Sequence, residues 1–110
     1  MAYTTINKSS LHMNTKLYTG DATTSHAITG VGFQPDMTWI KSRTSTDTHA
    51  LFDAVRGATK RIIPNDTTAE GTQSNGLTSF DSDGFTLGDA GLVNQNYNYA
   101  SWNWKAGTSF

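Results

Sequence analysis

The sequence of 110 residues has no cysteine, little charge and few large aliphatic side chains. The lack of cysteine excludes a disulfide, a thiolate zinc site and a thiol nucleophile. Leu, Ile, Val and Phe total 19 residues, about 17% of the chain, a fraction that also occurs in disordered proteins. Disordered chains usually carry a large net charge as well, whereas this chain has a net charge of −1 and 12 aromatic residues. We therefore expect one small, ordered domain with a thin core.

The balance of charges and the short apolar runs exclude two classes of partner. Nine acidic against eight basic residues provide no basic surface for a nucleic acid. The apolar runs reach only two or three residues, which is too short to cross a membrane. The first ten residues also lack the apolar core of a secretion signal. We predict that neither a nucleic acid nor a membrane is a partner.

The residues that are abundant indicate strands and turns. Thr, Ser, Asn and Gly supply 46 residues, and there is one Glu against eight Asp. Thr and aromatic residues favour strands, whereas Asp, Asn, Ser and Gly favour turns. The strands that alternation and turn residues predict are 16–19, 26–29, 37–43, 49–55, 60–63, 77–80, 85–87 and 99–105.

Seven or eight short antiparallel strands predict an all-β fold, a β-sandwich or a jelly roll. We expect this domain to cover residues 15–110, behind a polar N-terminal arm formed by residues 1–14. In segment 49–55, Leu51 and Val55 also have the i, i+4 spacing of a helix, so a short helix remains an alternative there.

Aromatic side chains have to supply much of the core, because aliphatic ones are scarce. The expected core anchors are Trp39, Phe52, Phe80, Phe85 and Trp102. The alternative for the tryptophans is a platform on which a sugar ring stacks, together with Trp104, Tyr97 and Tyr99.

Candidate catalytic and metal-binding residues are few. Residues 81–84 (DSDG) predict a hairpin turn, and the carboxylates of Asp81 and Asp83 leave calcium as an alternative. His49 lies close to Asp47, but no nucleophile elbow accompanies the pair. We expect no catalytic residue, no bound metal and no cofactor.

Three groups of residues are candidates for contacts with a partner protein. The arm carries the first group. The second group is the basic cluster of Arg56, Lys60 and Arg61, and the third is Tyr97 and Tyr99 in an Asn-rich segment. The candidates in the arm are Tyr3, Ile6, Leu11 and Met13.

Six segments together resemble a known module. They are YTG (18–20), GVGFQPD (30–36), WIKSR (39–43), LFDAVRGATK (51–60), SFDSDGFTLG (79–88) and WNWKAG (102–107). In this order they resemble the β-rich module of roughly 100 residues found in tailed-bacteriophage virion proteins. Many of those proteins come from marine phages and carry the label tail-fibre or lectin-like.

The resemblance implies a non-enzymatic virion protein. One unit with a polar arm suits a capsid decoration (cement) protein that binds across subunits of the major capsid protein. We then expect self-association as a trimer or another symmetric oligomer, synthesis in the host cytoplasm and a final place on the outer surface of the particle. The alternative is a receptor-binding module of a tail fibre or head appendage, with Tyr97 and Tyr99 against a host-surface glycan.

Overall fold

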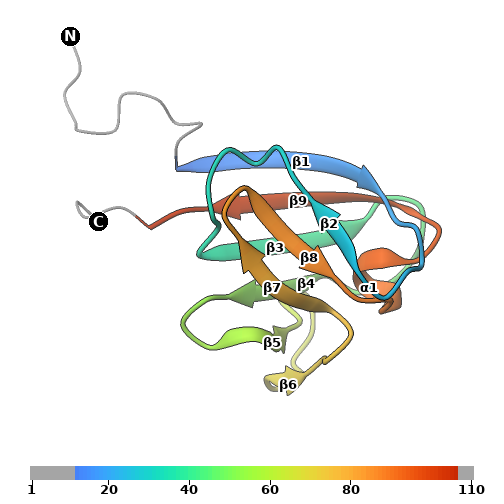
Figure 1. Cartoon of the computed structure of the whole chain (residues 1–110). Coiled ribbons are helices and arrows are strands. Elements are labelled where there is room, and N and C mark those ends of the chain that lie inside the picture. Colours follow the sequence, from blue (N-terminus) through green and yellow to red (C-terminus); the bar gives the residue numbers. More distant parts are fainter. Residues whose placement is uncertain (1–11, 107–110) are drawn as a thin grey trace, which may run out of the picture.

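The computed structural model describes residues 12–106. The regular secondary structure of this part of the chain is almost entirely strand and forms two antiparallel sheets, which confirms the predicted all-β fold (Figure 1). The larger sheet contains, in spatial order, β1 (Met13–Thr19), β9 (Asn98–Trp104), β3 (Met37–Ser42), β4 (Ala50–Asp53), β5 (Gly57–Ile62) and β6 (Gly71–Thr72). The smaller sheet contains β2 (His26–Ile28), β8 (Gly84–Leu87) and β7 (Leu77–Asp81).

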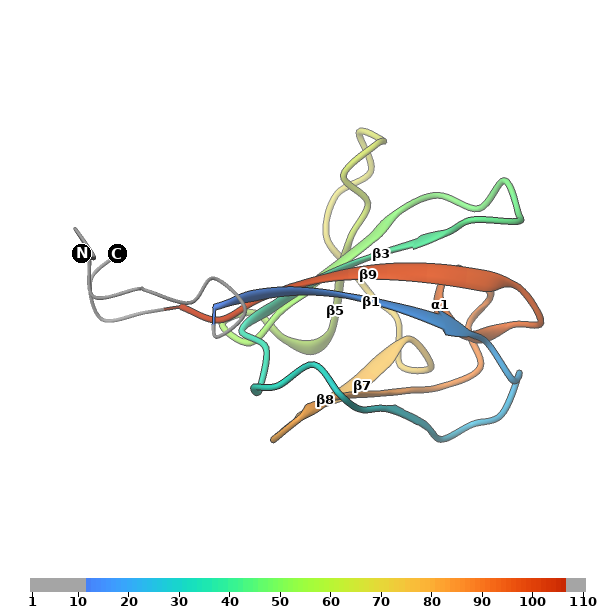
Figure 2. The ribbon, with the colours of Figure 1, turned by 90° about the horizontal axis from the view of Figure 1, so that it is seen from above.

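The smaller sheet covers one face of the larger sheet, and the core lies between them (Figure 2). Phe52 and Phe85 are fully buried in this core, as predicted, and Phe80 packs against it while partly buried. The prediction that Trp39 and Trp102 anchor the core is wrong. Both are half-buried, and they alternate with buried neighbours, so their side chains lie on the other face of the larger sheet.

Strand β1 begins earlier than the sequence predicted. Met13 and Asn14 were assigned to the arm, but they pair with Trp104 and Asn103 at the start of an unbroken register along β9. The partner strand determines this boundary, because the polar sequence of 12–15 has little strand pattern of its own. The remaining arm residues, 1–11, lie outside the described residues.

Segment 49–55 is a strand, and the helical alternative is wrong. Ala50 and Phe52 of β4 are buried while Leu51 and Asp53 are half-buried, which is the alternation of a strand. Val55 lies beyond β4 in the turn that leads to β5, with 98% of its side chain exposed. The spacing of Leu51 and Val55 therefore has no structural meaning.

The predicted hairpin turn at 81–84 joins β7 to β8, because Asp81 pairs with Gly84. The Asp83 carboxylate accepts hydrogen bonds from the backbone N–H groups of Gly30 (2.9 Å) and Gly32 (2.8 Å), which lower the pKa of Asp83. Gly84 cannot be replaced without movement, since a Cβ there would lie 1.8 Å from the carbonyl oxygen of Ile28. The turn is thus fastened to the loop after β2.

The two carboxylates of this turn have different hydrogen-bond partners. Asp81 accepts from the hydroxyl groups of Ser79 (2.9 Å) and Thr86 (2.6 Å), away from the contacts of Asp83. Within residues 12–106 no group of three or more His, Cys, Asp or Glu side chains is arranged to hold a metal ion.

Two short elements were not predicted from the sequence. Strand β6 and the four-residue helix α1 (Gly91–Asn94) lie in segments predicted as loops. Both are too short to produce a periodic pattern. No helix in the described range has the length and apolar character needed to cross a membrane.

Candidate binding face

The largest side chains of β3 and β9 lie on the face of the larger sheet that is turned away from the smaller sheet. Trp39 pairs with Trp102, and Met37 pairs with Trp104. Strands on either side add further apolar residues in register with these two rows. We call the following half-buried set the outer face: Met13, Met37, Trp39, Leu51, Trp102 and Trp104.

Two connections project on the same side as the outer face (Figure 2). One joins β3 to β4 through residues 43–49, and the other joins β5 to β6 through residues 63–70. The backbone N–H of His49 in the first donates to the side-chain oxygen of Asn65 in the second (3.1 Å). The outer face is therefore flanked by two connections that are fastened to each other.

An open pocket of about 260 Å³ lies on the outer face, lined by Trp39, His49, Trp102 and Trp104. The rings of Trp39 and Trp102 meet edge to face, with centroids 6.5 Å apart and planes inclined by 71°. The ring of His49 lies 5.8 Å from that of Trp39. Aromatic rings in such a corner present apolar walls to whatever enters it.

A hydrogen bond fixes the histidine of the pocket. The indole Nε1–H of Trp39 donates to Nδ1 of His49 at 3.0 Å. Because an indole nitrogen only donates, Nδ1 must be the acceptor, and the neutral ring carries its hydrogen on Nε2. Burial and the charge of Lys41 lower the pKa of His49, which favours this neutral form.

The ammonium group of Lys41 is held by the connection beside the pocket. It donates to the backbone carbonyl groups of Ser42 (2.6 Å), Asp47 (3.2 Å) and Ser45 (3.4 Å). The carboxylate of Asp47 accepts from the hydroxyl of Ser45 (2.9 Å) and is not bonded to His49. A catalytic pairing of Asp47 with His49 is therefore absent from this structure.

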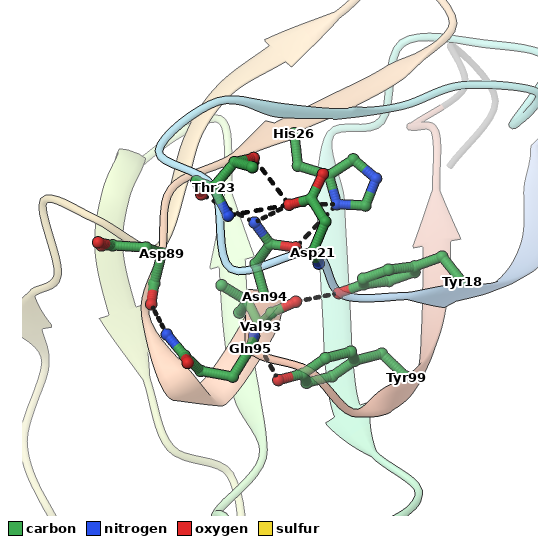
Figure 3. A network of polar contacts seen from close by, with 9 residues as sticks. All are labelled: Tyr18, Asp21, Thr23, His26, Asp89, Val93, Asn94, Gln95 and Tyr99. Carbon is green, nitrogen blue, oxygen red and sulfur yellow. Dashed lines mark hydrogen bonds and ion pairs between the residues drawn. The ribbon is translucent and has the colours of Figure 1, made fainter.

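A second cluster of polar side chains surrounds the buried Asn94 at the end of α1 (Figure 3). Its side-chain nitrogen donates to the carboxylate of Asp21 (3.1 Å) and to the carbonyl of Thr23 (3.0 Å). Its oxygen accepts from the backbone N–H of Asp21 (3.0 Å) and from Nδ1 of His26 (2.7 Å). The cluster fastens the loop between β1 and β2 to α1, and its members are each other's partners.

A family model matches residues 8–110, which is nearly the whole chain. The chain belongs to this family, the domain of unknown function DUF7483. No curated protein and no solved structure matches it. The function of this DUF7483 domain therefore has to be argued from its own residues.

Of the two tyrosines predicted to contact a partner, the DUF7483 domain exposes one. Tyr97 has 39% of its side chain exposed. Tyr99 is fully buried, so its prediction as an exposed contact is wrong. Its hydroxyl donates to the carbonyl of Gly91 (2.8 Å), and its ring stacks on Tyr18 at 5.2 Å. Burial raises the pKa of both stacked tyrosines.

The basic residues do not form one free patch. Arg56 makes an ion pair with Asp53 (2.6 Å) and lies 3.5 Å from Glu70. Lys60 donates to the hydroxyl of Thr72 (2.9 Å), and Arg61 donates to the side chain of Gln73 (2.8 Å). The contacts of Lys60 and Arg61 hold β5 to β6 and to the residue after it, and those of Arg56 hold the turn after β4 to Asp53 and Glu70, so the three cations are separately occupied.

Of the arm candidates, only Met13 lies in the described residues, where it belongs to the outer face. Tyr3, Ile6 and Leu11 lie outside them. The sequence does not predict the role of His49 in the pocket, because its hydrogen bond joins the connection before β4 to Trp39 of β3. The pattern of Trp102 and Trp104 did place both on one face, but it did not say which face is buried.

Proposed function

We propose that this DUF7483 domain is a non-enzymatic protein of a tailed-bacteriophage virion that decorates the capsid by binding across subunits of the major capsid protein. The outer face with its pocket is the observation that carries the proposal. Three tryptophans and two methionines gather there, half-exposed, on a domain in which large apolar side chains are scarce.

The composition of the outer face is typical of a protein–protein contact. Aromatic residues and methionine are enriched at the centres of interfaces, and tryptophan is prominent among the residues whose truncation weakens binding most. The pocket between Trp39 and Trp102 offers a place for one side chain of a partner. Such a pocket is where an anchoring residue would dock.

The position at which β1 begins also supports a contact through the outer face. Met13 opens β1 and pairs with Trp104, so the segment that precedes residue 12 joins the domain beside the tryptophans. An arm that starts there can extend a contact made by the outer face. Many copies bound in this way stabilise a shell, because a ligand that binds only the assembled state shifts the equilibrium towards it.

Binding of a host glycan is the second candidate, favoured by the same indole rings. Aromatic faces stack on the apolar faces of sugars. A sugar also presents many hydroxyl groups, which need both donors and acceptors. The acceptor Nδ1 of His49 is already bonded to Trp39, so the pocket meets this requirement poorly.

The experiment measures capture of the purified protein by heads of the phage that lacks its gene. We expect saturation at hundreds of copies per head, and Trp102→Ala should weaken capture at least about 30-fold, the loss of a strong interface anchor. Val55→Ala is the matched control, since Val55 is an exposed apolar residue away from the outer face.

Two results would contradict the proposal. One is capture of only a handful of copies per head, and the other is equal capture of the Trp102→Ala and Val55→Ala variants. Binding to host cells that is lost with Trp102→Ala, without capture by heads, would support the glycan alternative.

A further inference from the structure

We propose that strand β1 pairs antiparallel with β1 of a second copy of this chain, about a two-fold axis at Thr15, so that the larger sheets of the two copies form one continuous sheet. Strand β1 is the outermost strand at one edge of the larger sheet (Figure 1). The inference goes beyond the proposed function, because it assigns a different partner to a different surface and rests on the backbone of this strand.

The backbone of β1 presents a row of hydrogen-bonding groups to the outside of the sheet. At one end of the register with β9, the carbonyl of His12 accepts from the N–H of Lys105 (2.8 Å). At the other end, the N–H of Gly20 donates to the carbonyl of Tyr97 (2.9 Å). Hydrogen-bonded positions alternate along an antiparallel pair, so the even-numbered residues of β1 direct their backbone groups towards β9. The residues whose backbone groups point away are Met13, Thr15, Leu17 and Thr19.

These outward groups are available to another strand. No backbone hydrogen bond among residues 12–106 uses the N–H or carbonyl groups of the four outward residues. A row of donors and acceptors that alternates in this way is matched by the backbone of an extended strand. The partner that fits the edge of β1 is therefore a strand.

The other sheet edges of the described residues are short or irregular. Strand β6, at the far edge of the larger sheet, has two residues, and β2, at one edge of the smaller sheet, has three. Strand β7, at the opposite edge, shifts its register between Leu77 and Ser79. Short edge strands and bulges are common protections against pairing with another chain. Strand β1 has neither, since its seven residues keep an unbroken register and include no proline.

The single charged side chain of β1 does not block its edge. A charged residue, especially lysine, often protects an edge strand. Lys16 extends instead to the loop after β2, where its Nζ would lie 3.1 Å from a Cβ added to Gly30. The four outward residues are all uncharged, and Leu17 has 57% of its side chain exposed.

The side chains of β1 match a second copy in one register. With Thr15 opposite its own copy, Met13 lies opposite Leu17 on both sides of the axis, so that apolar residues face each other. An axis at Lys16 would place two like charges opposite each other, which is unfavourable. An axis at Leu17 would produce one apolar pair instead of two.

The two-fold symmetry also joins the outer faces. An axis perpendicular to the sheet keeps corresponding faces of both copies on the same side. Met13 pairs with Trp104 within one copy, so the Met13–Leu17 contacts would continue the apolar surface of one outer face into the next. The dimer would thus present two outer faces side by side.

Sedimentation equilibrium of the full chain tests the pairing. One strand pair is a smaller contact than a standard interface, so we expect a dissociation constant on the order of 100 µM, with dilute samples monomeric. Leu17→Lys places a charge opposite Met13 and should weaken the dimer at least about tenfold. Val55→Lys is the matched control, since it introduces the same charge at an exposed apolar residue away from β1 and should leave the dimer unchanged.

A single introduced cysteine reports the register, because the chain has none of its own. Residues opposite each other in a hydrogen-bonded pair have Cα atoms about 5.5 Å apart, which a disulfide can bridge. Under mild oxidation at high protein concentration, Thr15→Cys should form a linked dimer at least about tenfold faster than Val55→Cys.

Three results would overturn the inference: a monomer at every concentration up to the solubility limit, equal linking of Thr15→Cys and Val55→Cys, or faster linking of Leu17→Cys than of Thr15→Cys. The outcomes also separate the pairing from the proposed function. Capture by heads of a chain that stays monomeric refutes the pairing alone. A dimer with the expected linking but without capture by heads refutes the capsid partner and supports the pairing.

Discussion

Part of β3 and β9 reverses the usual order of polar and apolar side chains between the two faces of the larger sheet. On the inner face, β3 and β9 place Thr38, Ser101 and Asn103, all buried and polar, against the rest of the core. On the outer face the same two strands place Trp39 and Trp102. Antiparallel sheets with one solvated face normally turn apolar residues inward and polar residues outward.

The buried polar residues of the inner face cost the fold little stability because they form hydrogen bonds with one another. The side-chain oxygen of Asn103 accepts from the hydroxyl of Thr38 (2.9 Å), and its nitrogen donates to Ser101 (3.1 Å) and to the carbonyl of Asn14 (3.2 Å). Buried polar groups cost little when every hydrogen bond is made. The outer tryptophans meet no such requirement of the fold, which is consistent with the contact proposed for them.

The largest expected effect comes from breaking the inner layer with Asn103→Ala. This change leaves the hydroxyl of Thr38 and the carbonyl of Asn14 without their partner, so we expect the free energy of unfolding to fall by about 2–4 kcal/mol. Urea denaturation measures it. The double variant Thr38→Val with Asn103→Ala should lose less than the sum of the single losses, and strict additivity would contradict a shared network.

Truncation on the outer face should affect stability less and binding more. Trp102→Ala removes contacts of a half-buried ring without opening a cavity in the core, so we expect a loss of about 1 kcal/mol. Capture by heads should fall far more, as argued above. A loss of stability as large as that of Asn103→Ala would show that the outer tryptophans are core residues after all.

The sequence predicted the positions of the strands well, but it did not predict which face of the larger sheet is buried. Alternation placed Trp39 and Trp102 on one side and Thr38 and Asn103 on the other. The assumption that large apolar side chains are buried then assigned the tryptophans to the wrong side, because the inner positions beside them are taken by small polar residues that bond to one another between strands. The prediction for Tyr99 failed for a related reason, since its ring stacks on Tyr18, a residue near the other end of the sequence.

A smaller effect is expected from the pH dependence of stability, which tests the role of His49 in the pocket. Its pKa is lowered in the folded state, so as the pH falls below about 6.5 the unfolded chain binds the proton first and stability declines. Protonation of Nδ1 also breaks the bond from Trp39. Stability should therefore weaken on acidification. In His49→Gln, which keeps an acceptor without titrating, this part of the decline should be absent.

The smallest expected effect locates the boundary of the outer face. Leu17 lies on β1, on the same side as Met13, with 57% of its side chain exposed. Since Leu17→Ser removes little buried surface, the free energy of unfolding should change by less than about 0.5 kcal/mol. If capture by heads is also unchanged, the contact ends at the tryptophans of β9. A loss of capture without a loss of stability would extend the binding surface along β1, the strand that follows the arm.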